Sequence, residues 1–442
     1  MNVWDSTIDI GSVREIRTKT TAYLGVGAIA KIADIATELR NRGIDRVLVM
    51  CGRGSYRSTG AWDHVQKALA ASRIAFALYD RVTPNPTVDS VDEAVALGRS
   101  FGARAVVAIG GGSPIDAGKS AAILLEYGDK SARDLYELKF VPERAVPVVA
   151  VNLTHGTGTE VDRFAVVSIP EKEFKPAIAY DCIYPLYAID DPALMTGLSS
   201  DQTRFVSIDA VNHVLEACTT KAASPYTILL AQETVRLVAH YLPIAIENPK
   251  DLRARYFLLY ASMIAGICFD NGLLHFTHAL EHPLSAMKPE LAHGLGLAMI
   301  VPAVVREIYP AVPAVLASVL EPITGPLKGL PEEAETVAKA LESWLFSLGV
   351  TKKLRDEGFA EDAIARLVHL ARHTPSLDGL LSMAPVASGA AVIERIYRTS
   401  LAPLASRPGT SSFAAPPPNR TAGLSSRPFV VRSVISAVAT SG

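Results

Sequence analysis

The sequence lacks the cysteine patterns that define disulfide frameworks and thiolate metal sites. Its four cysteines are scattered, and none forms a CxxC pair. Such thiols are typical of proteins from a reducing compartment. The N-terminus lacks the apolar core of a signal peptide, and we find no charge-free window of about 18 apolar residues. We therefore expect a cytoplasmic protein without a membrane span.

An excess of charge of one sign is also absent. Lys and Arg number 43 against 45 Asp and Glu, which gives a net charge of −2. This balance argues against a nucleic-acid binder that depends on phosphate attraction. We find no internal repeat and no heptad run. With 442 residues, of which 49% are hydrophobic, the chain has material for two or three globular domains.

The first half alternates short apolar runs with helical patterns. The apolar runs cover residues 46–50, 74–79, 104–109 and 147–151, and helical patterns cover about 60–72 and 88–101. Apolar strands that alternate with helices predict a doubly wound parallel sheet buried on both faces. We therefore predict an N-terminal doubly wound α/β domain over residues 1–195.

From about residue 198 the spacing becomes helical, with Pro and Gly between the helical segments. We expect an all-α domain over residues 196–401. Residues 402–442 are rich in Ser, Pro, Ala and Gly and contain no acidic residue. We expect this low-complexity tail to be disordered and to contribute little to fold or catalysis.

A glycine-rich loop follows the third predicted strand and opens a helix. It carries Gly110, Gly111, Gly112, Ser113 and Asp116. Glycines let the backbone approach a ligand closely, and the free N–H groups of a helix start bind phosphate. The loop is neither GxGxxG nor a Walker loop. We interpret it as a pyrophosphate site, with an ordinary glycine turn as the structural alternative.

A second polar loop, residues 152–160, follows the fourth predicted strand and contains Thr154 and Thr157. Ligands settle at the carboxyl ends of strands in open α/β sheets. Because two such strand ends would face one crevice, we predict that both threonines contact the nucleotide. An ordinary polar loop is the alternative.

Histidines gather in the second half, where His275, His278, His282 and His293 lie close in sequence. Upstream, Asp209 and His213 are four residues apart in an apolar helical segment. An Asp buried in such a helix is costly unless it is paired or binds a metal. A carboxylate with imidazoles is a ligand set for Fe²⁺, Zn²⁺ or a similar ion. Any single histidine could instead be a satisfied core residue.

Together these motifs resemble the iron-dependent (group III) alcohol dehydrogenases of the dehydroquinate-synthase-like superfamily, over about residues 23–401. The resemblance implies a nucleotide-binding domain, a helical domain, and a metal and nicotinamide between them. It implies a homodimer or higher homo-oligomer, and Fe²⁺ as the ion with Zn²⁺ as the alternative. By motif, the metal ligands are Asp209, His213, His278 and His293.

The resemblance assigns three more residues. His282 matches a histidine close to the nicotinamide and substrate, which would relay the hydroxyl proton. Asn85 and Lys175 match positions that approach the cofactor. The alternative is that His282 hydrogen-bonds a ligand carboxylate and that the other two are plain loop residues.

Two departures from the family pattern bear on the site. The interval from His278 to His293 is one residue longer than expected, which weakens the assignment of His293. The stretch before Gly156 reads Asn-Leu-Thr-His instead of Pro-Thr-Thr-Ala, and the family offers no precedent for the contacts of Leu153 and His155.

The position that selects the cofactor lies after the first of the four predicted strands. Relatives that use NAD resemble one another in carrying an Asp there, whereas this sequence has Gly52, followed by Arg53, Ser55 and Arg57. Arginine binds phosphate oxygens in a forked geometry. We therefore predict NADP(H) over NAD(H), with solvated surface arginines as the alternative.

The predicted function is a metal-dependent alcohol dehydrogenase or aldehyde reductase that acts on a small alcohol or aldehyde. Three alternatives remain at this point. A dehydroquinate-synthase-like lyase would need basic residues around the metal, and residues 271–287 have no Lys or Arg. A glycerol-dehydrogenase-like zinc enzyme would lack the ligand His213. A nucleotide-binding protein with structural histidines is the third.

Overall fold

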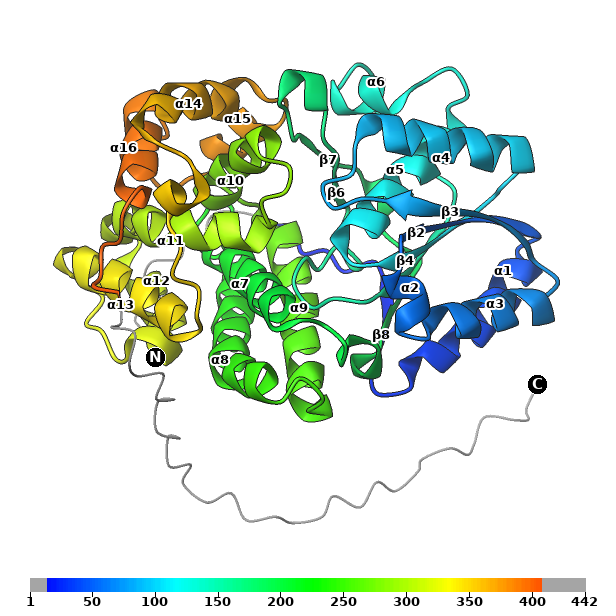
Figure 1. The fold of residues 1–442 in the computed structure, drawn as a ribbon, viewed down its shortest axis with the longest axis horizontal. Helices are drawn as coiled ribbons and strands as arrows, with labels where there is room; N and C mark the ends of the chain where they lie inside the picture. Colours follow the sequence, from blue (N-terminus) through cyan, green and yellow to red (C-terminus); the bar gives the residue numbers. More distant parts are fainter. Residues whose placement is uncertain (1–13, 408–442) are drawn as a thin grey trace, which may run out of the picture. The chain divides into compact units, whose positions relative to one another are not determined.

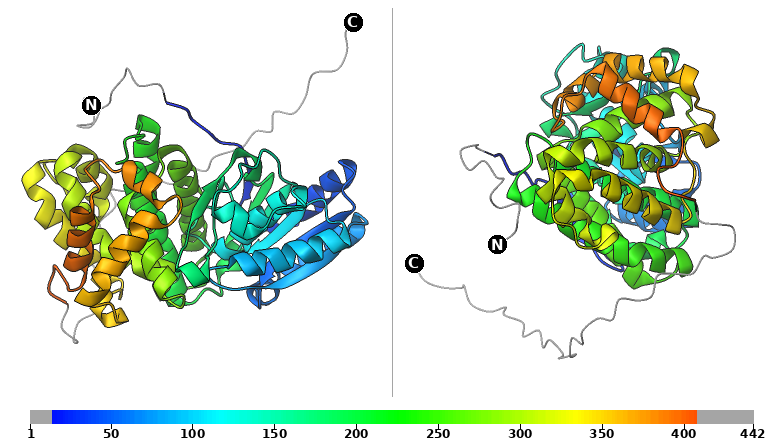
Figure 2. Two further views of the ribbon diagram at one scale, coloured as in Figure 1. Left: turned by 90° about the horizontal axis from the view of Figure 1, so that it is seen from above. Right: turned by 90° about the vertical axis from the view of Figure 1, so that its left-hand side faces the viewer.

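The computed structural model describes residues 14–407, and in them a sheet lies beside a group of helices (Figures 1 and 2). Six strands form one sheet in the order β1-β8-β5-β4-β2-β3, with every neighbouring pair parallel. They are β1 (Thr21–Leu24), β2 (Arg46–Gly52), β3 (Ala75–Val82), β4 (Val106–Gly110), β5 (Val148–Asn152) and β8 (Tyr187–Asp190). The predicted fold class is confirmed.

Alternate residues of β2 face opposite sides of the sheet. Val47 and Val49 are buried against the helices α1 (Ile32–Asn41) and α3 (Ala61–Ala71). Leu48 and Met50 are buried against α4 (Val88–Phe101) and α5 (Gly112–Glu126). Both sets of helices are visible in Figure 1, on either side of the strands. A strand buried on both faces needs a continuous apolar run, which is the pattern in the sequence.

The order of strands reverses between β2 and β4. From β2 the chain moves to β3 at one edge, and from β4 it moves to β5 in the other direction. Ligands of open α/β sheets bind beyond the carboxyl ends of the strands at such a reversal. Here β2 ends at Gly52 and β4 ends at Gly110.

Helices form the second part. They are α7 (Ser200–Ala217), α8 (Pro225–Glu247), α9 (Leu252–Gly272), α10 (Phe276–Met287), α11 (His293–Ile308), α12 (Pro313–Thr324), α13 (Ala334–Ser347), α14 (Ile364–His373), α15 (Leu377–Ser382) and α16 (Ala390–Ser400). Short helices α2 (Ser55–Ser58) and α6 (Ala132–Tyr136) belong to the sheet part, as does the antiparallel pair β6 (Phe164–Val166) and β7 (Ala177–Ala179). The helical character predicted for the second half is confirmed.

Two helices are long and apolar enough to cross a membrane by length and composition alone, Leu252–Gly272 and the run His293–Ala311. Both contain charged residues, such as Arg255 and Arg306, so neither is the charge-free run that the sequence was found to lack. Both helices contribute side chains to the buried core of the helical part, including Leu258 and Met299. Core helices of this kind satisfy the same criterion, so they give only weak evidence for a membrane span.

The last described residues lie on the helical part. The backbone N–H groups of Leu404 and Ala405 each donate to Glu342 Oε2 at 2.6 Å. The other carboxylate oxygen of Glu342 pairs with Lys353 Nζ at 2.8 Å, and both side chains are buried. The predicted tail therefore begins with residues that contact the fold, and the rest of it, from residue 408, lies outside the described residues.

Candidate metal and nucleotide site

Helix α7 places Asp209 and His213 on one face, because residues four apart in a helix are neighbours. Ser199 caps the helix by accepting a hydrogen bond from the Gln202 N–H at 3.1 Å. Asp209 and His213 are 3% and 6% exposed. An ionisable pair this deeply buried calls for a compensating partner.

Asp209 Oδ1 faces three imidazole nitrogens. The Nε2 atoms of His213, His278 and His293 lie 3.6, 3.4 and 3.7 Å from it. Ligands at about 2.0–2.2 Å from a tetrahedral ion stand about 3.4 Å apart, so these separations suit such an ion. Among the described residues, Asp209, His278 and His293 also have ligand atoms within 4.8 Å of one another. The structure thus brings together all four predicted metal ligands.

The charge states of Asp209 and His213 fit a cation between them. Burial raises the pKa of Asp209, but His213, His278 and His293 oppose it and lower it to about 2. Burial lowers the pKa of His213 to about 4, and its Nδ1 is buried without a hydrogen-bond partner. An ionised carboxylate beside a neutral imidazole is the donor set that a divalent metal requires.

Two glutamates that the sequence analysis did not single out orient the histidines. Glu216 Oε2 accepts a hydrogen bond from His278 Nδ1 at 2.6 Å, and Glu281 Oε2 contacts His293 Nδ1. Both carboxylates are fully buried. A carboxylate on the far nitrogen fixes the tautomer that presents Nε2 to a metal. The signal in the sequence was their helical spacing, since Glu216 is three residues after His213 and Glu281 three after His278.

His282 lies on the same helix face as His278, and its ring centroid is 5.9 Å from that of His293. Its Nδ1–H donates to the carbonyl oxygen of Lys175 at 2.8 Å, which leaves Nε2 as the unprotonated nitrogen. The Nζ atom of Lys175 in turn lies 3.4 Å from Glu281 Oε2. Lys175 is therefore part of the histidine cluster, whereas its predicted contact with a cofactor stays a prediction.

His275 belongs to the protein interior and does not join the cluster. Its Nδ1 accepts a hydrogen bond from the Phe276 N–H at 2.6 Å, and its Nε2 contacts Thr219 Oγ1 at 2.9 Å. Both ring nitrogens therefore have hydrogen-bond partners within the protein, one in the first residue of α10 and the other just after the end of α7. Of the four clustered histidines in the sequence, this one is the satisfied core residue.

The two polar loops of the sheet part contact each other. A Cβ atom added to Gly111 would lie 2.7 Å from Thr154 Oγ1, and one added to Gly112 would lie 2.7 Å from Thr157 Cγ2. Both positions therefore require glycine. The first turn of α5 has no acidic residue, and its N-cap makes no side-chain hydrogen bond. Pro114 has no N–H and the Ile115 N–H donates to the Gly111 carbonyl oxygen at 3.3 Å, so the N–H groups of Gly112 and Ser113 are the ones that could bind an anion.

Asp116, on α5, accepts hydrogen bonds from the second polar loop and from β6. Its Oδ1 accepts a hydrogen bond from Thr159 Oγ1 at 2.6 Å, and its Oδ2 accepts one from the Val166 N–H at 3.0 Å. Burial raises the pKa of Asp116 to about 6, although Lys119 opposes this. Because both oxygens have internal partners, the geometry favours a role in holding the loop over direct contact with a nucleotide.

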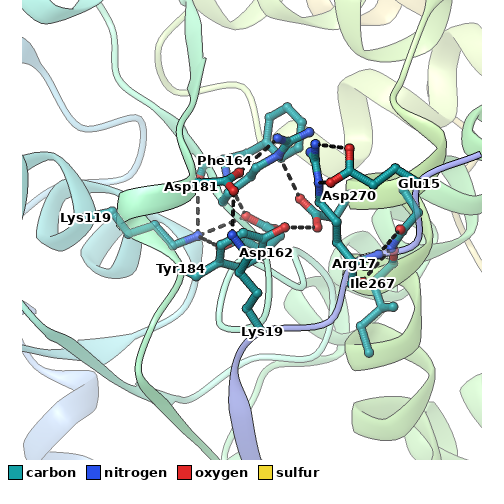
Figure 3. Close-up of polar contacts among 12 residues, drawn as sticks. Glu15, Arg17, Lys19, Lys119, Asp162, Phe164, Asp181, Tyr184, Ile267 and Asp270 are labelled. Atoms are coloured by element: carbon teal, nitrogen blue, oxygen red, sulfur yellow. Dashed lines mark hydrogen bonds and ion pairs between the residues drawn. The ribbon is translucent and has the colours of Figure 1, made fainter. Parts of the chain in front are cut away.

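A buried polar network joins the sheet part to α9 (Figure 3). Lys119 Nζ lies 2.9 Å from Asp162 Oδ1, and both side chains are almost fully buried. Nearby, Asp270 on α9 accepts a hydrogen bond from the Tyr184 hydroxyl and lies 3.3 Å from Arg163 Nε. The two parts of the protein therefore share charged contacts as well as apolar ones.

The loop after β2 has room for a larger residue. A Cβ atom at Gly52 would lie 3.4 Å from the Val82 carbonyl oxygen, an ordinary contact. Arg53 and Ser55 are exposed. Arg57 NH2 lies 3.7 Å from Asp80 Oδ2, an acidic neighbour from β3 that the sequence analysis did not consider. One of the arginines predicted to bind phosphate therefore already has a partner.

Asn85 lies where the two parts meet. Its side-chain Nδ2 donates to the carbonyl oxygen of Pro289 at 2.8 Å, in the loop that leads to His293. Its backbone φ is 51°, in the left-handed region that Asn tolerates better than most residues. The sequence predicted a position near the cofactor, and the structure shows a contact between the sheet part and the loop before α11.

Comparison with known proteins identifies relatives along nearly all of the chain. Residues 19–192 match the family model "Iron-containing alcohol dehydrogenase", and residues 205–401 match the model of the C-terminal part of the Fe-containing alcohol dehydrogenase family. A long-chain primary alcohol dehydrogenase, AdhA, of Thermoanaerobacter ethanolicus is 62% identical over 398 residues, which cover 90% of this chain and all of the relative.

More distant relatives include a 1,3-propanediol dehydrogenase of Klebsiella pneumoniae, which is 33% identical over 68% of this chain and 78% of its own length. Among solved structures, an NADH-dependent butanol dehydrogenase of Thermotoga maritima superposes with a TM-score of 0.81 at 27% identity, and the match covers 88% of this chain and 99% of that one.

Proposed function

Because the chain belongs to the iron-containing alcohol dehydrogenase family, we propose that it transfers hydride between a primary alcohol or aldehyde and NADP(H). The observation that carries the proposal is the position of Asp209 Oδ1 among three imidazole Nε2 atoms at 3.4–3.7 Å. Long-chain primary alcohols are the substrate class to test first, because the relative at 62% identity is named for them.

In this proposal Asp209, His213, His278 and His293 hold one divalent ion, Fe²⁺ or Zn²⁺. The ion would supply Lewis-acid chemistry, which lowers the pKa of an alcohol and polarises a carbonyl. The chain's own groups do the rest. Glu216 and Glu281 hold two of the imidazoles in orientation, and His282, with Nε2 unprotonated, accepts the hydroxyl proton.

The start of α5 would bind the cofactor pyrophosphate through the N–H groups of Gly112 and Ser113, with Thr154 and Thr157 beside it. The absence of a carboxylate at Gly52 and the exposed Arg53 and Ser55 support the 2′-phosphate of NADP(H). NAD(H) is the competing cofactor, since Asp80 already pairs with Arg57.

The two related enzyme classes fit less well. A dehydroquinate-synthase-like lyase would need cationic side chains for a phosphorylated substrate, whereas the metal-flanking residues 271–287 contain no Lys or Arg. A glycerol-dehydrogenase-like zinc enzyme would lack His213 as a ligand, whereas His213 Nε2 faces Asp209 here.

The test is NADPH and NADH oxidation with aldehydes of increasing chain length, before and after dialysis against a chelator. The proposal predicts that dialysis against the chelator abolishes aldehyde-dependent oxidation of the nicotinamide cofactor and that added Fe²⁺ or Zn²⁺ restores it. A rate that survives complete removal of the metal would contradict it. We also propose a homodimer or larger oligomer in the cytoplasm, which sedimentation and cell fractionation would check.

A further inference from the structure

Arg255, in the first turn of α9, is completely buried yet has no acidic partner among the residues that the structure describes. Its NH1 atom donates to His155 Nε2 at 2.9 Å and to Thr203 Oγ1 at 2.8 Å, and its Nε atom donates to the Pro249 carbonyl oxygen. The NH2 atom has no partner. A buried cation at the positive end of a helix is unfavourable for stability.

Arg255 determines the tautomer of His155. A guanidinium group only donates hydrogen bonds, so His155 Nε2 accepts and the ring proton lies on Nδ1. That Nδ1–H donates to Ser207 Oγ at 3.2 Å. Thr203 and Ser207 are one turn apart on α7, so the network of Arg255 and His155 contacts one face of this helix.

The network joins the two halves of the site. His155 lies between Thr154 and Thr157, the threonines that contact Gly111 and Gly112. Ser207 comes two residues before Asp209. Between these points Gly156 lies so close to the Val206 carbonyl that a Cβ atom there would overlap it. The loop that contains His155 therefore contacts α7 through the backbone at Gly156, and the His155 imidazole joins the two by its hydrogen bond to Ser207.

We propose that His155, held by Arg255, is a positioning residue that fixes the nucleotide-binding loops relative to the helix that carries Asp209 and His213. The inference rests on the proposed function, because it assumes that these loops bind the cofactor. His155 touches neither substrate nor metal in this proposal. It acts through the loop and α7.

The test compares the variants H155L and H155Q. Leucine fills a similar volume but can neither accept a hydrogen bond from Arg255 nor donate one to Ser207. Glutamine stays neutral and has a carbonyl oxygen that can accept and an NH2 group that can donate. L345A, in the buried core of α13, serves as a destabilised control far from the loops. Cofactor dissociation constants from fluorescence titration, metal content from elemental analysis, and kcat and KM would be measured for each.

We expect H155L to weaken cofactor binding about tenfold, as the loss of about one buried hydrogen bond implies. Its cofactor KM should rise more than its kcat falls. H155Q should stay within about threefold of the wild type, and L345A should melt earlier with unchanged cofactor binding.

Cofactor binding by H155L equal to that of the wild type, together with a lowered melting temperature, would overturn the inference and leave His155 a packing residue. Should H155L fail to fold, S207A removes only the hydroxyl that His155 contacts, and unchanged cofactor binding in S207A would overturn it equally. A wild-type protein that binds neither NADPH nor NADH would instead overturn the proposed function and this inference with it.

Discussion

The contact between Glu342 and the segment after α16 predicts where the chain can be shortened. Two backbone N–H groups, of Leu404 and Ala405, donate to a buried carboxylate oxygen. Hydrogen bonds to charged groups contribute about 1.5–3 kcal/mol each. A chain that ends at Leu401 loses both, so its free energy of unfolding should fall by about 3–6 kcal/mol. A chain that ends at Arg407 keeps both and should lose little.

Urea unfolding and thermal melting of the two truncated proteins and the full chain would measure this difference. For a protein of this size, the shorter variant should melt about 4–7 °C earlier, while the chain that ends at Arg407 should match the full length in melting temperature, oligomeric state and aldehyde reduction. Equal stability of both truncated proteins would refute the reasoning. Loss of activity or solubility on ending at Arg407 would instead show that residues 408–442 matter.

Three further predictions concern the site. The variants H213A and H278A should lose bound metal in elemental analysis, because each removes one of four ligand groups, and full occupancy in both would contradict the ligand set. The variant G52D should fold, since its Cβ has room. It should shift the cofactor preference from NADPH toward NADH by about 2 kcal/mol, or about thirtyfold. A wild type that already prefers NADH would contradict this interpretation of the loop. Burial and the charge of Arg255 lower the pKa of His155 from 6.5 to about 3 in the folded protein. In the unfolded chain the imidazole takes up a proton as the pH falls through 6.5, whereas the folded protein does not, so the free energy of unfolding decreases below pH 6.5. Between near pH 7 and near pH 5, urea unfolding should show the wild type losing about 2 kcal/mol more than H155Q, and equal losses would argue against a neutral buried imidazole.

Sequence patterns were sufficient for the central strands of the sheet and for the domain character of each half. Apolar runs at residues 46–50 and 147–151 stand out because both faces of those strands are buried. The short strands β1 and β8 escaped notice, because four residues give too little periodicity to detect. The pair β6 and β7, with three residues each, is set by tertiary contacts and not by a local pattern.

The site was predictable where one helix supplied the spacing. Asp209 and His213 stood out because a carboxylate and an imidazole four residues apart interrupt an apolar segment. Asp80 did not, because its contact with Arg57 joins β3 to the short helix α2 and depends on how β2, which precedes that helix, pairs with β3. The role of Glu216 likewise depends on how α7 packs against α10, which the sequence does not display.

The charged contacts of Asp270 bear on how the protein can move. Any rotation that separated α9 from the sheet part along this seam would draw Asp270 away from Tyr184 and Arg163 and leave a buried carboxylate without partners. Removing one partner from such a group is strongly unfavourable. On the other side of the junction, Asn85 donates one exposed hydrogen bond to the Pro289 carbonyl oxygen, and Lys175 contacts Glu281 and His282. The seam at Asp270 thus opposes any motion that would separate α9 from the sheet part.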